Sequence, residues 1–199
     1  MAVASALAVT LDQRGHLRAQ TDLVTTTPDA LGAAVCSAVQ RLAGREASVV
    51  RCSVVGQGRR AFAMAMLRDV PGGMFLSGTA LADDACDAVL QAVLTALGIE
   101  ENFLSAAAKR WTDRVDVQAA GVIDAEGVAP SLDDEAGLNP HVRLVQTLPA
   151  PGRLAVTTQE AEYRVLRFPA AALVVSTTPN ADALQEIDAW MASAEAMGP

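Results

Sequence analysis

Aromatic residues, basic residues and long apolar runs are all scarce in this chain of 199 residues. Phe, Trp and Tyr together make up 4% of it, and 15 Lys and Arg face 23 Asp and Glu, which gives a formal net charge of −8. This excess of acid argues against binding of the nucleic-acid backbone as the main task. Because no stretch of 18 uncharged apolar residues occurs, no membrane-spanning helix is expected.

Histidine and cysteine, the residues that most often bind metals or act as nucleophiles, are also few. His16 and His141 lie in expected loops without a partner at metal-ligand spacing, so we expect both to be exposed. Cys36, Cys52 and Cys86 include no Cys-x-x-Cys pair, and their odd number is typical of free thiols in a reducing compartment. We therefore expect a cytoplasmic protein whose cysteines are small core residues.

Alanine and valine are what the chain has in quantity. Hydrophobic residues make up 51% of the sequence, which is enough for a substantial core. The length allows one large domain or two domains of about 100 residues. The apolar residues 1–9 lack the basic region of a signal peptide, so we interpret them as leading into a strand.

Turn residues and apolar spacing divide the first half into two strands, a helix, three strands and a second helix. Thr27 and Pro28 form a helix start, because threonine is a good N-cap and proline fits the first helical position. Gly44 and Gly98 end the two helices. The expected elements are strands 5–10 and 17–23, a helix 28–43, strands 48–55, 61–67 and 74–78, and a helix 83–97.

The second half is expected to start with a helix and to end with one. Its stretch 131–151 is polar and contains three prolines, which argues against a long helix there. The expected elements are a helix 100–115, strands 117–122, 153–158, 163–168 and 171–176, and a helix opened by residues 177–182.

Two short patterns recur in the two halves and suggest an internal repeat. Each half has a hydrophobic-Asp-x-x-Gly turn directly after an expected strand. Each also has a small, hydroxyl-rich segment that we place between a strand and the closing helix. The matching pairs are Leu11-Asp12-x-x-Gly15 with Ile123-Asp124-x-x-Gly127, and residues 76–80 with residues 175–179.

This arrangement resembles the Roadblock/LC7 module of the profilin-like and longin-like group. The resemblance covers residues 5–98 and 101–195, so we expect an α+β protein with domains 1–99 and 100–199, each an antiparallel sheet flanked by helices. The first module lacks a leading helix and the second lacks most of its middle helix. The resemblance implies a non-catalytic module that forms a homodimer or heterodimer and regulates or scaffolds a partner such as a small GTPase.

No group of residues points to catalysis or to a cofactor. The loop 56–60 lacks the spacing of a phosphate-binding loop, and no Gly-x-Ser-x-Gly motif occurs. Asp83 and Asp84 stand where a helix begins and are interpreted as caps. Asp12 and Asp124 are expected to accept backbone hydrogen bonds in their turns, and residues 133–135 lack the spacing of a calcium loop.

The arginines are the one charge pattern that suggests a partner surface. They fall on or beside the expected middle hairpin of each half, and in an acidic protein such a group can form an interface. The candidate residues are Arg51, Arg59, Arg60 and Arg68 in the first half and Arg153, Arg164 and Arg167 in the second.

Two other classes of function stay open. One is a small-molecule sensor in which helix starts at Thr27, Thr79 and Thr178 bind a carboxylate. The other is an acidic chaperone of the secretion type, which an exposed apolar groove would favour.

Overall fold

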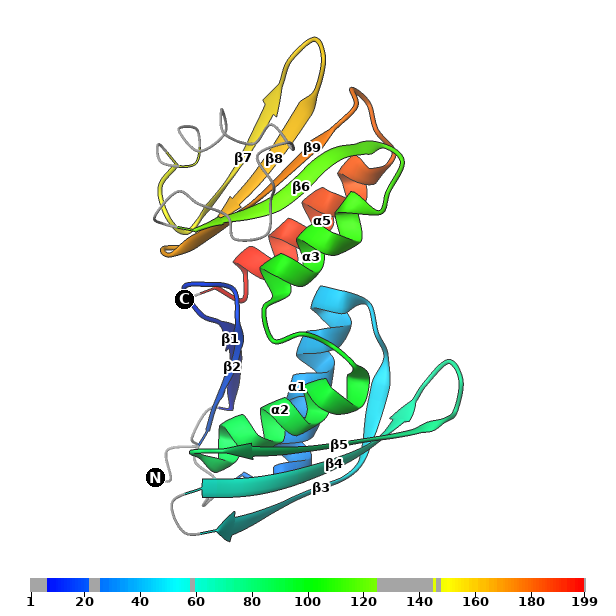
Figure 1. Cartoon of the computed structure of the whole chain (residues 1–199), viewed down its shortest axis with the longest axis vertical. Helices are drawn as coiled ribbons and strands as arrows, with labels where there is room; N and C mark the ends of the chain where they lie inside the picture. Colours follow the sequence, from blue (N-terminus) through cyan, green and yellow to red (C-terminus); the bar gives the residue numbers. More distant parts are fainter. Residues whose placement is uncertain (1–6, 22–25, 58–59, 125–144, 146–147, 199) are drawn as a thin grey trace, which may run out of the picture. The chain divides into compact units, whose positions relative to one another are not determined.

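A computed structural model describes residues 7–21, 26–57, 60–124, 145 and 148–198 of the chain. The protein is α+β, and the described residues form four helices and three antiparallel sheets (Figure 1). The chain divides into two compact units. Unit 1 consists of Met1–Thr10 and Leu17–Glu101, and unit 2 consists of Leu11–His16 and Asn102–Pro199.

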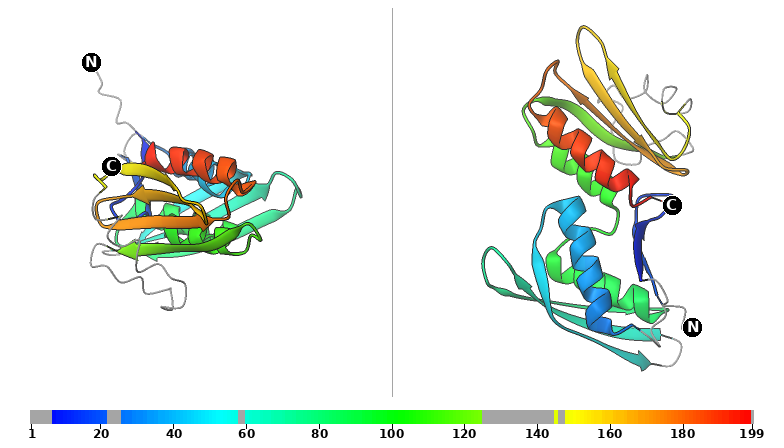
Figure 2. Two further views of the ribbon diagram at one scale, coloured as in Figure 1. Left: turned by 90° about the horizontal axis from the view of Figure 1, so that it is seen from above. Right: turned by 180° about the vertical axis from the view of Figure 1, so that it is seen from behind.

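Unit 1 is built around a three-stranded meander with helices on one face. α1 packs on β3, and α2 packs on β4 and β5 (Figure 2). The N-terminal strands β1 and β2 pair with each other in a separate sheet. The elements are β1 (Ala8–Leu11), β2 (Leu17–Gln20), α1 (Pro28–Ala43), β3 (Ala47–Gln57), β4 (Arg60–Asp69), β5 (Phe75–Ala82) and α2 (Ala85–Leu97).

Unit 2 contains a four-stranded sheet of order β6-β9-β8-β7, against which two helices pack. Its core on the helix side contains the large side chains of Phe103, Trp111, Leu166, Leu173 and Trp190. The elements are α3 (Phe103–Thr112), β6 (Val117–Asp124), β7 (Gly152–Thr157), β8 (Glu162–Arg167), β9 (Ala171–Thr177) and α5 (Ala183–Glu195).

Local capping explains where three of the helices begin. The side chain of Thr27 accepts a hydrogen bond from the amide of Ala30, and Pro28 occupies the first turn of α1. Asp84 and Asn102 cap α2 and α3 in the same way. The caps that the sequence indicates at Thr27 and Asp84 are therefore confirmed, and Gly44 and Gly98 end α1 and α2 in the left-handed conformation.

Gly78 lets α2 approach β5 closely. A Cβ atom at this position would overlap the carbonyl oxygen of Ala92 and the amide nitrogen of Ala96, both in the backbone of α2. The segment 76–80 thus lies inside β5, and its expected place between a strand and a helix is wrong. Thr79 is likewise a strand residue and begins no helix.

The order of elements expected for the first half is observed, with shifted boundaries. The helix expected over 100–115 is shorter, because Asn102 caps it and Asp113 ends it. Residues 11–16, expected in the first domain, belong to unit 2, because Leu11 donates to the carbonyl of Met197 and Ala170 donates to that of Gln13. Most of the stretch 131–151 lies outside the described residues. No helix in the described part is long and apolar enough to cross a membrane.

Candidate functional site

The middle strand of unit 1 carries three large apolar side chains on the outside of the sheet. Along β4, Ala61, Ala63, Ala65 and Leu67 point toward the helices and are buried. Between them, Phe62, Met64 and Met66 point the other way and are 38%, 42% and 39% exposed. Since successive side chains of a strand point to opposite faces, Phe62, Met64 and Met66 lie on the face away from α1 and α2, and Leu67 is the one large apolar residue of β4 on the helix side.

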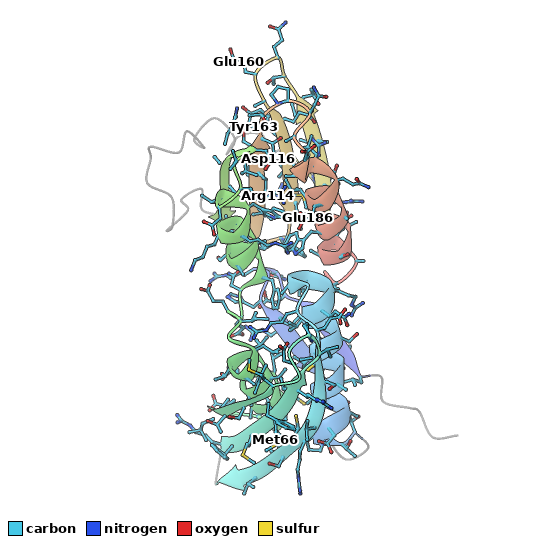
Figure 3. All side chains as sticks on the ribbon, turned by 90° about the vertical axis from the view of Figure 1, so that its right-hand side faces the viewer. Met66, Arg114, Asp116, Glu160, Tyr163 and Glu186 are labelled. Atoms are coloured by element: carbon cyan, nitrogen blue, oxygen red, sulfur yellow. The ribbon has the colours of Figure 1, made fainter. Side chains whose placement is uncertain are left out.

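The neighbouring strands extend this apolar surface. The register places Val55 and Leu81 on either side of Phe62, Arg51 beside Met66, and Phe75 beside Arg68. Residues directly opposite each other in an antiparallel pair share a face. We call this surface the open face, and Met66 is labelled on its sheet in Figure 3. It comprises Arg51, Val55, Phe62, Met64, Met66, Arg68, Phe75 and Leu81.

Within unit 1, as far as the structure describes it, no helix or strand lies against the open face. Exposed large apolar side chains are concentrated on β3, β4, β5 and the turn between β4 and β5. Outside this region the described chain exposes only one, Val115, which precedes β6. Large contiguous apolar surfaces on folded proteins are typical of interaction sites, so this surface is the candidate site.

Three of the expected arginines lie on this side of the sheet. Arg60 is at one end, where its Nε is 3.6 Å from a carboxylate oxygen of Asp83. Arg51 and Arg68 are at the other end, as diagonal neighbours across β3 and β4, because Arg51 faces Met66. Neither forms an ion pair with any residue that the structure describes, whereas Arg59 lies outside the described residues.

The arginines of the second half serve contacts within unit 2. Nε of Arg164 donates to Asp188 at 2.8 Å, and Arg153 pairs with Glu195. Nη1 of Arg167 donates to the carbonyl oxygens of Val145 and Leu148. Arg164 and Arg167 are three residues apart in one strand, so they lie on opposite faces, and the single partner surface expected for them does not form.

A groove of about 590 Å³ lies between α1 and the edge strand β3. Its helix side is formed mainly by small residues, among them Ala30, Ala33 and Cys36. The edge of β3 is partly blocked there, since the side chain of Asp29 accepts the backbone N–H of Cys52 and the register shifts between Val49 and Arg51. A bulge and an occupied edge amide both oppose addition of a further strand.

The cysteines beside this groove are unreactive. Burial raises the pKa of Cys36 to about 11, and burial followed by the nearby Asp29 carboxylate raises the pKa of Cys52 to about 11. Both thiols are protonated at neutral pH and are poor nucleophiles. The interpretation of Cys36 as a core residue is confirmed, whereas Cys86 is only partly buried.

A charged cluster in unit 2 joins α3, β6 and α5 (Figure 3). Arg114 donates from Nε to Asp116 at 3.2 Å and from Nη1 to Glu186 at 2.9 Å. The other oxygen of Asp116 accepts the amide of Ala183 at 2.7 Å. The hydrogen bond from Arg114, and next that from Ala183, lower the pKa of Asp116. These groups satisfy one another, so the cluster is structural.

The remaining polar candidates also have local roles. Oδ1 of Asp12 accepts the amides of Arg14 and His16, which confirms the expected turn. His16 is partly buried and bridges to Asn102, so the prediction that it is exposed is wrong. His141, residues 133–135 and the side chain of Asp124 lie outside the described part. Within that part, no three potential metal ligands come together.

Comparison with known proteins finds no match: no protein-family model, no curated protein and no solved structure matches the chain.

The open face was not anticipated as an apolar surface, although its pattern is visible in the sequence. Residues 61–67 read Ala-Phe-Ala-Met-Ala-Met-Leu, in which alanine alternates with a large apolar residue. Such a strand is apolar on both faces and cannot have an ordinary solvated side. This alternation in the sequence indicates a strand whose second face is also apolar and suited to contact with another element or molecule.

Proposed function

We propose that this protein is a non-catalytic protein-interaction module and that the open face of unit 1 is its docking surface. The observation that carries the proposal is the arrangement of β4, which buries alanine on one side and exposes Phe62, Met64 and Met66 on the other. Burial of this surface by a partner would remove several large apolar side chains from water.

The resemblance to Roadblock/LC7 modules suggests a more specific form of this function, the regulation or scaffolding of a small GTPase. The order of elements in unit 1, with two strands, a helix, three strands and a helix, supports that suggestion. β1 and β2 pair with each other and do not join the sheet β3-β4-β5. The resemblance does not account for this separation.

An acidic chaperone is the second candidate, because an exposed apolar face also suits an unfolded client. The sensor hypothesis has less support. Of its three expected helix starts, only Thr27 is one, since Thr79 lies in β5 and Thr178 stands five residues before α5 begins at Ala183.

The test is affinity capture with the full chain and two variants, followed by reconstitution. Met64→Lys places a charge on the open face, and Val115→Lys places the same charge on a fully exposed residue elsewhere. We expect a partner that wild type and Val115→Lys retain and Met64→Lys loses, and that binds again when purified. A folded GTPase as that partner supports the regulatory form, and unfolded clients support the chaperone. If no partner depends on Met64, the proposal is wrong.

A further inference from the structure

Unit 2 shows how this chain covers the outer face of a sheet. The outer face of β8 and β9 is the one away from α5, as the bond from Arg164 to Asp188 on the helix side indicates. On this outer face, Val165, Ala172 and Val174 form a buried apolar cluster with Val145. Leu148 packs against the same cluster. Val145 and Leu148, which precede β7, therefore cover this sheet from outside.

An arginine holds the covering residues in place. Nη1 of Arg167, at the end of β8, donates to the carbonyl oxygen of Val145 at 3.0 Å and to that of Leu148. Hydrogen bonds from a charged guanidinium are stronger than neutral ones. The cover thus has two parts: apolar side chains on the middle of the sheet, and backbone carbonyls at an arginine near the end of the middle strand.

Unit 1 has the corresponding arginine without the cover. The strands β3-β4-β5 and β7-β8-β9 are both antiparallel meanders followed by a helix. Arg68 is the second-last residue of β4 and faces Phe75, the first residue of β5. Arg167 is the last residue of β8 and faces Ala172, the second residue of β9. Both arginines lie on the face opposite the helix that follows.

We propose that the open face binds an apolar helical segment of a partner protein, with the carbonyl end of that segment and an adjoining carboxylate at Arg51 and Arg68. The inference rests on the proposed function and names the occupant of the same surface. The two guanidinium groups provide positive charge that no described carboxylate neutralises. Among the residues that the structure describes, the acidic side chain in an ion pair at this face is that of Asp83, at the opposite end beside Arg60.

The dimensions and the charge both favour a helix over a second copy of the chain. Three strands span about 10 Å, which matches the diameter of one helix. A second copy would bring another basic face toward Arg51 and Arg68 and would add a further net charge of −8 to the complex. An acidic segment instead supplies the missing counter-charge locally.

Two synthetic peptides test the inference against the full-length chain. Each is an 18-residue amphipathic helix with leucine at every third or fourth position, and they differ only in ending Gly-Glu-Glu or Gly-Gln-Gln. We expect the Glu peptide to bind about tenfold more tightly at low salt, by fluorescence anisotropy, and the difference to shrink as salt rises. The double variant Arg51→Ala/Arg68→Ala should abolish the difference, and the control Arg60→Ala should keep it.

The outcomes separate this inference from the proposed function. If both peptides bind equally and Met64→Lys weakens both, the open face is a docking surface, and the inference that Arg51 and Arg68 bind a carboxylate at the end of the segment is wrong. If neither binds and sedimentation shows a dimer that Met64→Lys dissociates, the occupant is a second copy and the inference is overturned. If neither binds a monomeric chain, the inference is also overturned, and the capture experiment decides on the proposed function separately. Unchanged circular dichroism establishes that each variant is folded.

Discussion

The sheets of the two units differ in what covers their outer faces. In unit 2, all seven residues of β9 are buried, because α3 packs on one side of this strand and Val145 and Leu148 pack on the other side of the sheet. In unit 1, β4 alternates between buried and exposed residues although it is apolar on both sides. The outer face of the meander is therefore covered by Val145 and Leu148 in unit 2, whereas no described element of unit 1 covers the corresponding face.

The comparison teaches that the chain can tolerate an apolar surface that it does not need for its own core. The alanines of β4 already allow close packing against α2. The large residues on the open face add nothing to that packing. The net charge of −8 opposes self-association. The proposed binding role accounts for phenylalanine and methionine at these positions, whereas the packing of unit 1 does not require them.

The chain carries natural probes that follow the two units separately. Both tryptophans, Trp111 and Trp190, belong to unit 2, and all three cysteines belong to unit 1. Tryptophan fluorescence therefore reports the unfolding of unit 2. The reactivity of the buried thiols of Cys36 and Cys52 reports the opening of unit 1.

The largest expected difference in stability is between two variants that each place a lysine on the outer face of one sheet. Val165→Lys buries an unpaired ammonium group among Val145 and Val174, so it should destabilise unit 2 by about 3–5 kcal/mol. Met64→Lys should change the stability of unit 1 by less than about 0.5 kcal/mol. Urea titrations followed by tryptophan fluorescence and by thiol reactivity measure the two values. Equal losses of stability in the two variants would contradict the difference between a covered and an uncovered outer face.

The next largest effect tests the covered side of the open sheet. Gly78→Ala forces a methyl group into the backbone of α2 at Ala92 and Ala96, and should destabilise unit 1 by about 3 kcal/mol. Gly56→Ala is the matched control, because no atom lies within 4 Å of its added Cβ. Faster labelling of Cys36 and Cys52 in the first variant alone is the expected result. Slow labelling in both would show that the contact at Gly78 is looser than described.

A smaller effect compares the two arginines directly. Arg167→Ala removes the hydrogen bonds to Val145 and Leu148 and should destabilise unit 2 by about 2 kcal/mol. Arg68→Ala removes no side-chain hydrogen bond or ion pair that the structure describes and should change the stability of unit 1 by less than about 0.5 kcal/mol. The midpoints of urea unfolding provide the comparison. A large loss for Arg68→Ala would mean that its guanidinium is already engaged.

The smallest effect concerns pH and unit 2 alone. Because Arg114 and the amide of Ala183 lower the pKa of Asp116, its charged form stabilises the fold above its ordinary pKa of about 3.9. That contribution is lost as the pH falls through the lower pKa of the folded state. Asp116→Asn should therefore have a lower urea midpoint than wild type at pH 7, and the difference should vanish in acid.

Tryptophan fluorescence measures this pH dependence, and Asp113→Asn, at the exposed end of α3, is the control. A difference between Asp116→Asn and wild type that persists unchanged below the ordinary carboxyl pKa would contradict the assigned cause.

Local signals made the helices and the order of strands in unit 1 predictable. The Thr27-Pro28 start and Gly44 define α1, since capping and backbone preferences act within a few residues. The open face could not be derived in the same way. A strand that is apolar on both sides does not reveal which side the helices cover, and that choice depends on the close approach at Gly78.

The arginine surface was predictable only in part, for a geometric reason. Arg51 and Arg68 share a face because the register between β3 and β4 aligns them, which no single strand shows. Arg164 and Arg167 fall on one expected hairpin, yet an odd spacing within a strand places them on opposite faces. The engagement of Arg167 with Val145 and Leu148 depends on residues about twenty positions away.

The hairpin turn at residues 11–16 has a consequence for how this protein is made. Its backbone bonds to Met197 and Ala170, so unit 2 contains residues translated before nearly all of unit 1 and others translated after it. On the ribosome, unit 1 can complete its contacts first, because Ala170 and Met197, the partners of Gln13 and Leu11, are translated 157 and 186 residues after them. A fragment that starts at residue 102 would lack this turn, so a functional dissection has to use point variants or a circular permutant.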